Sequence, residues 1–64
     1  MNFRELEKLI LAAGWQYKNC VGSHYQYVHP VKSGKVTIPN HVGDIPRAVV
    51  QSVLKQAGLK SNIR

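Results

Sequence analysis

The sequence is poor in cysteine, in acidic residues and in long apolar runs. The shortage of cysteine and of apolar runs each excludes a class of protein. Cys20 is the only cysteine, so the chain cannot form the internal disulfides that small secreted folds usually need. A reducing cytoplasm is therefore the expected setting. Residues 1–13 include Glu5 and Glu7, which is unlike a signal peptide, and no apolar stretch is long enough to cross a bilayer.

Basic residues outnumber acidic residues by nine to three, which gives a formal net charge of +6. Such a field attracts polyanions, which include RNA, DNA, anionic membranes and acidic proteins, although the same charge can serve solubility alone. A chain of this length buries only about 60% of its unfolded surface, so its core is thin. A deep pocket for a small molecule is not expected, and a surface site for a macromolecule fits better.

Two segments have the apolar spacing of amphipathic helices. The first begins with a capping box of Asn2 and Glu5 and ends before Gly14, and its stripe consists of Phe3, Leu6, Leu9, Ile10 and Ala13. The second follows Asp44 as its cap and Pro46 in its first turn, and its stripe consists of Val49, Val50, Val53, Leu54 and Ala57. Each stripe needs another element against which to pack.

Three segments between these helices have the pattern of strands, at residues 15–20, 24–29 and 35–39. The first alternates like a half-buried strand. Because neither helix can bury its stripe alone, both must pack on one face of a three-stranded antiparallel sheet. The sequence predicts an α+β fold in the order α-β-β-β-α, which is the order of double-stranded-RNA-binding domains. Residues 1–59 form one domain in this prediction, and residues 60–64 form a loose tail.

The stretch from Gly22 to Pro30 carries the residues with the clearest chemistry. Alternation along the second strand places His24 on the face opposite to Tyr25 and Tyr27. If the tyrosine face is buried, His24 lies at the start of a strand on the open face of the sheet. It is then held rigidly and stays within reach of a large ligand.

His24 is the main catalytic candidate. Imidazole takes and gives a proton near neutrality, and RNA carries its own nucleophile in the 2′-hydroxyl group, so an RNA-cleaving site needs mainly a base and hydrogen-bond donors. Gly22 lets a phosphate approach the backbone, and Ser23 offers a hydroxyl group and an N–H. The same three residues also fit a plain surface turn with no catalytic role.

Three lysines lie on the first strand, in the turn after the second strand and on the third strand, and they bracket His24. Lys18, Lys32 and Lys35 are the candidates to bind RNA phosphates. His41, in the loop after the third strand, is a distant second catalytic candidate.

A metal site is not expected, although Cys20, His24, His29 and His41 all carry ligand atoms. His24 and His29 fall on opposite faces of one strand and about 17 Å apart, whereas zinc ligands must meet at one ion. No phosphate-binding loop or dinucleotide fingerprint is present, so no cofactor is expected either.

Several motifs, in this order and at this length, are shared with one family. They are Ala12-Ala13-Gly14-Trp15, Gly22-Ser23-His24, Tyr27, His29-Pro30, Val36-Thr37-Ile38-Pro39 with His41, and Ser52-Val53-Leu54-Lys55-Gln56-Ala57-Gly58-Leu59. Together they resemble the HicA (YcfA-like) toxin family of bacterial toxin–antitoxin systems. The resemblance differs at Cys20, where the family often has a basic residue, and at Arg47-Ala48, where it often has Gly-Thr.

The resemblance implies a double-stranded-RNA-binding-like fold, an mRNA endoribonuclease whose catalytic histidine is His24, and a HicB-like antitoxin partner. The sequence thus leads us to expect a cytoplasmic, metal-independent ribonuclease toxin with no small-molecule ligand. Two alternatives stay open at this point. One is an RNA-binding module without catalysis, and the other is a basic interaction protein that docks an acidic partner.

Overall fold

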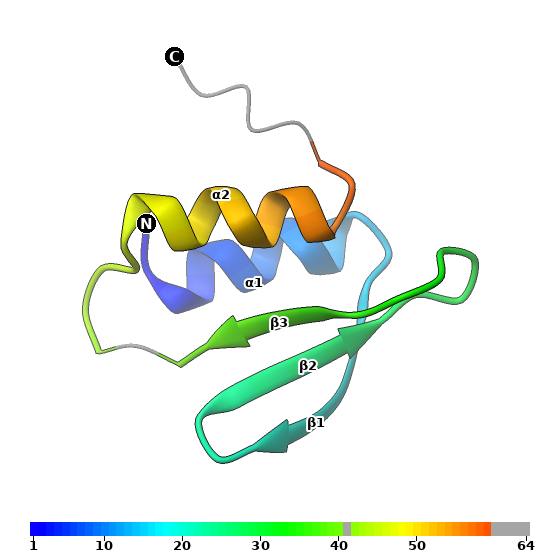
Figure 1. Cartoon of the computed structure of the whole chain (residues 1–64), viewed down its shortest axis with the longest axis horizontal. Coiled ribbons are helices and arrows are strands. Elements are labelled where there is room, and N and C mark those ends of the chain that lie inside the picture. The colour runs from blue at the N-terminus through cyan, green and yellow to red at the C-terminus, as the bar shows by residue number, and fades with distance from the viewer. Residues whose placement is uncertain (41, 60–64) are drawn as a thin grey trace.

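The structure describes residues 1–40 and 42–59. They contain two helices and three strands in the order α-β-β-β-α (Figure 1). In this computed structural model the elements are α1 (Phe3–Ala12), β1 (Gln16–Val21), β2 (His24–Val28), β3 (Val36–Pro39) and α2 (Arg47–Gln56). The strands form one antiparallel sheet in the order β1-β2-β3. Both helices cover the same face of this sheet (Figure 1), so the predicted α+β class and element order are confirmed.

Two finer parts of the fold prediction stay predictions. One is the closer likeness to double-stranded-RNA-binding domains, and the other is the extent of the single domain. The predicted tail at 60–64 and His41 lie outside the described residues.

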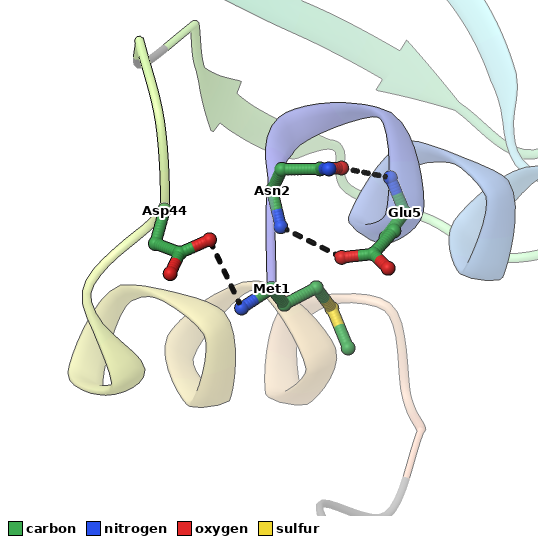
Figure 2. Close-up of polar contacts among 4 residues, drawn as sticks. All are labelled: Met1, Asn2, Glu5 and Asp44. Atoms are coloured by element: carbon green, nitrogen blue, oxygen red, sulfur yellow. Dashed lines mark hydrogen bonds and ion pairs between the residues drawn. The ribbon is translucent and has the colours of Figure 1, made fainter.

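A capping box begins α1, as the sequence predicts. The backbone N–H of Glu5 donates to the side-chain oxygen of Asn2 at 2.8 Å, and the Asn2 N–H donates to the Glu5 carboxylate at 3.0 Å (Figure 2). Leu6 and Ile10 are fully buried, but Leu9 is 42% exposed. The prediction that Leu9 belongs to the buried stripe is therefore wrong. Its side chain points about 100° around the helix from that of Ile10, at the margin of the buried face.

Both helices end in a Schellman motif, which fixes the path of the chain that follows. The N–H of Trp15 donates to the Ile10 carbonyl at 3.1 Å, and the N–H of Leu59 donates to the Leu54 carbonyl at 2.9 Å. Gly14 has the left-handed φ of +98° that the first motif requires, and the glycine before Leu59 serves the second in the same way. Each motif returns an apolar side chain to the core.

Two contacts between distant parts of the chain hold the helices side by side and parallel (Figure 1). Near their starts, Asn2 and Asp44 form an isolated antiparallel bridge. Near their ends, the indole N–H of Trp15 donates to the Ala57 carbonyl at 3.1 Å. Trp15 is only 2% exposed, so this hydrogen bond is buried and its loss would leave an unpaired polar group.

Asp44 does not cap α2, so that part of the sequence prediction is wrong. The N-cap residue is Pro46, and it makes no side-chain hydrogen bond to the helix. The Asp44 carboxylate lies instead 3.9 Å from the amino group of Met1 (Figure 2), and the next N–H, of Ile45, donates to the Met1 carbonyl at 2.8 Å. The first residues of the chain pack beside this loop, a tertiary contact that local sequence does not show.

The helix-facing side of the sheet forms the core, but not along its whole width. Tyr27, Val36 and Ile38 are fully buried, as the alternation predicts. In β1 all six residues are exposed, so the predicted half-burial of the first strand is wrong for Tyr17, whereas Trp15, which directly precedes β1, is buried. β1 is the edge strand farthest from the helices (Figure 1), and even Tyr17, which pairs with Tyr27, is 51% exposed.

A hydrogen bond joins α1 to the central strand. The buried Tyr27 hydroxyl donates to the Glu7 carboxylate at 2.6 Å. Burial raises the pKa of Tyr27 well above its ordinary value, and the hydrogen bond and negative charge of Glu7 raise that pKa further. The folded state therefore holds the Tyr27 proton more tightly than the unfolded chain does.

Replacing Gly14 by alanine should destabilise the fold by about 2 kcal/mol or more. A Cβ at this position would lie 2.7 Å from Nε2 of His29, in addition to the strain of a positive φ. Gly34→Ala is the matched control, because Gly34 has φ +84° but nothing within 4 Å of the added Cβ, so it should cost about 1 kcal/mol. Denaturant unfolding measures both values, and equal losses would contradict the contact with His29.

Tyr27→Phe should lower the free energy of unfolding by about 1 to 2 kcal/mol near neutral pH, since it removes a hydrogen bond to a carboxylate. Because the folded-state pKa is raised, the wild type should also lose stability as the pH rises above about 10, where the unfolded chain ionises first. The variant should lose less there. Tyr17→Phe, at a side chain that is 51% exposed, is the control and should change the free energy of unfolding near neutral pH by less than about 0.5 kcal/mol. Denaturant titrations across this pH range test both expectations.

Candidate functional site

A two-residue turn, Gly22-Ser23, delivers His24 to the start of the central strand. Val21 and His24 pair across it, and Gly22 has φ +62°, which suits the first position of a type II′ hairpin turn. The Asn40 N–H donates to the Ser23 carbonyl at 2.7 Å, so the turn is tied to the end of β3. His24 is exposed, and its ring makes no hydrogen bond to residues 1–40 or 42–59.

The strand register shows which side chains share the open face with His24. Residues that lie directly opposite in an antiparallel sheet point to the same side, with Cβ atoms about 4.5–5.5 Å apart. Two rows therefore cross the sheet beside the turn. The first row is Val21, His24 and Pro39, and the second is Asn19, Gln26 and Thr37. Sequence reasoning named His24 but none of its neighbours on β1 and β3, because register depends on which strands pair.

Of the three predicted phosphate-binding lysines, Lys18 lies nearest to His24. The β1–β2 register shifts between Tyr17 and Asn19, so Lys18 is the extra residue of a β-bulge between the Tyr17–Tyr27 and Asn19–Gln26 pairs. Bulges often re-aim a side chain beside an active site. No glycine or proline marks this bulge in the sequence, so alternation alone missed it.

Lys32 and Lys35 lie at the other end of β2. They belong to the β2–β3 connection, and the four residue steps of β2 separate that end from His24 by about 13 Å. The Lys32 ammonium lies 3.5 Å from the Ala57 carbonyl, where its charge favours the C-terminal end of α2. The structure therefore does not group all three lysines around His24.

His29 has a structural position. Its Nδ1 accepts hydrogen bonds from the backbone N–H groups of Val31 and Lys32 at 3.0 and 3.1 Å, which assigns the proton to Nε2. Nε2 then donates to the Ala13 carbonyl at 3.2 Å, and the ring packs edge-on against Trp15. His29 thus holds the β2–β3 connection against the end of α1.

The candidate site is exposed, because His24 lies on the surface. Three surface hollows border the two helices and the N-terminus, and His24 lines none of these three. Within residues 1–40 and 42–59, no three histidine, cysteine or acidic side chains are grouped to hold a metal ion. The second catalytic candidate, His41, lies outside the described residues, although the preceding Asn40 is hydrogen-bonded to the Gly22-Ser23 turn.

The fold and the site together define a small, basic α+β domain with its candidate site on an open sheet face. The match to a family model makes the identification more specific: the chain belongs to the family of HicA toxins of bacterial toxin–antitoxin systems, and the match spans residues 3–59. A search of curated proteins gave no match to the chain. No helix among the described residues is long and apolar enough to cross a membrane.

Alanine variants of the two described histidines should differ in their free energy of unfolding. His29→Ala should cost roughly 2 kcal/mol, because it removes three hydrogen bonds and the contact with Trp15. His24→Ala should change the free energy of unfolding by less than about 0.5 kcal/mol, as expected of an exposed side chain. Denaturant unfolding of both variants tests this, and a large loss in His24→Ala would assign that residue a structural role.

Proposed function

We propose that this protein is the toxin of a toxin–antitoxin pair and cleaves mRNA in the cytoplasm, with His24 as the general acid/base and with no metal ion or cofactor required. The observation that carries the proposal is the exposed position of His24 at the start of the central strand. Membership of the HicA toxin family supports it, because toxins of this family generally cleave mRNA.

The proposed chemistry uses the 2′-hydroxyl group of RNA as the nucleophile. The imidazole of His24 takes the 2′ proton while the 2′ oxygen attacks the adjacent phosphorus atom. The bond from phosphorus to the 5′ oxygen breaks, and that oxygen takes a proton from solvent, which leaves a cyclic phosphate on one product and a 5′-hydroxyl group on the other. In the alternative role, the protonated imidazole acts as the general acid and gives its proton to the leaving 5′ oxygen. His41 is a secondary candidate for a proton-transfer role.

RNA binding is proposed to begin at the turn and to follow the strands. Gly22 leaves the backbone open to a phosphate, Ser23 supplies a hydroxyl donor, and Lys18 supplies the nearest positive charge. Lys32 and Lys35 would then bind phosphates several nucleotides away, since they lie at the far end of β2. The net charge of +6 favours the approach of a polyanion.

A HicB-like antitoxin is the proposed protein partner. The family model describes a toxin of a toxin–antitoxin system, so an antitoxin that neutralises the chain is implied in general terms. The basic surface favours an acidic partner.

The decisive experiment is RNA cleavage by purified protein in EDTA, with wild type compared with His24→Gln and His24→Ala. Loss of the general acid/base should lower the cleavage rate by roughly 10²- to 10⁴-fold. Gln51→Ala, on the exposed side of α2, is the control and should cleave like the wild type. Circular dichroism checks that each variant is folded.

Equal cleavage by the wild type and by folded His24 variants would remove His24 from the mechanism. RNA binding without cleavage by any form would identify a non-catalytic RNA-binding module. A stable complex with an acidic protein and no salt-sensitive RNA affinity would identify an interaction protein.

A further inference from the structure

We propose that the open face of the sheet carries a base-binding subsite next to His24, formed by Asn19, Gln26 and Thr37, and that it reads an adenine beside the cleaved phosphate. We call these three residues the amide row. The inference rests on the proposed RNA cleavage and deepens it, because it names the part of the substrate that the surface recognises.

The amide row lies immediately beside the candidate catalytic row. Gln26 is two residues after His24 on the same strand, so their side chains point to the same face about 7 Å apart. Asn19 and Thr37 lie directly opposite Gln26 on the neighbouring strands. A nucleotide whose phosphate contacts His24 therefore places its own base or the adjacent base over this row.

The row is rigid, and its polar groups are available. Gln26 is half-buried in the middle of the central strand, and the β3 edge beside it is fixed by the hydrogen bond from the Thr37 N–H to the Gln56 side chain at 3.1 Å. Within residues 1–40 and 42–59, no hydrogen bond uses the side chains of the amide row. Their donors and acceptors can therefore meet a base edge without breaking a protein contact.

No Phe, Trp or Tyr side chain is available to stack on a base on this face. Phe3 packs against Tyr25, Trp15 and Tyr27 are buried in the core, and Tyr17 pairs with Tyr27 on the helix side. These are all the Phe, Trp and Tyr residues of the chain. The exposed imidazole of His24 is assigned to the phosphate in the proposed function, so the amide row is left to recognise the base by hydrogen bonds to its edge.

A side-chain amide is well suited to adenine. It presents a donor and an acceptor side by side. On the Hoogsteen edge, adenine offers N6 as a donor beside N7 as an acceptor, whereas guanine offers two acceptors there. Lys18, the bulge residue directly before Asn19, places a positive charge next to the row. That charge can hold the flanking phosphate while the amides hold the base.

The test uses RNA oligonucleotides that are 2′-O-methylated at every position except one, so that cleavage occurs at a single phosphate. Two series of four oligonucleotides carry each base in turn, on the 5′ or the 3′ side of that phosphate. The wild type should cleave the adenine member of one series roughly 5- to 100-fold faster than the others. Gln26→Leu should reduce this ratio to near one.

Gln16→Leu is the matched control, because it makes the same chemical change at an exposed position at the far end of β1 and should keep the adenine ratio. A merely structural effect of Gln26→Leu would slow all four oligonucleotides equally and leave the ratio unchanged, which would overturn the subsite. Equal cleavage of all four by the wild type would overturn it as well.

Fully methylated oligonucleotides, which cannot be cleaved, separate failure of the subsite from failure of the proposed function. Fluorescence anisotropy with the same base series should show an adenine preference in affinity that Gln26→Leu abolishes. This result would support the subsite even if no form of the protein cleaved RNA. Cleavage without any adenine preference, in rate or in affinity, would leave the proposed function standing and overturn the subsite.

Discussion

The structure depends on a one-sided core. A chain this short can build only one thin apolar layer, and both helices must share the same face of a three-stranded sheet to bury their stripes. Leu6 and Ile10 of α1 meet Tyr27 and Ile38 of the sheet in this layer, and all of them are fully buried. The large apolar side chains are drawn to the helix side, which leaves the opposite face to polar and short side chains.

This division explains why His24 and His29, at the two ends of β2, lie in different surroundings. His24 begins β2 on the open face, where a large ligand can reach it. His29 follows the end of the same strand and turns toward the helices, where its ring bonds to the Ala13 carbonyl and fills the space that Gly14 leaves. Glycine at position 14 thus serves both the end of α1 and the anchoring of the β2–β3 connection.

The same division shapes the proposed RNA surface. The Phe, Trp and Tyr side chains lie on the helix side, so the open face offers an imidazole, amides and a hydroxyl group beside the bulge at Lys18. Such a surface suits hydrogen bonding to phosphates and base edges more than stacking. His24 is exposed on this face, which agrees with a macromolecular substrate and with a protein antitoxin.

The sequence by itself determined the element order, the capping box of Asn2 and Glu5, the glycine-ended helices and the outward position of His24, because these follow from local periodicity and from the restricted φ of particular residues. Tertiary structure decided the rest. Asp44 contacts Met1 and does not cap α2, Leu9 is exposed, and β1 lies beyond the cover of the helices. The bulge at Lys18 and the row around Gln26 exist only through strand register. Such features depend on which distant segments come together, and local patterning does not specify that pairing.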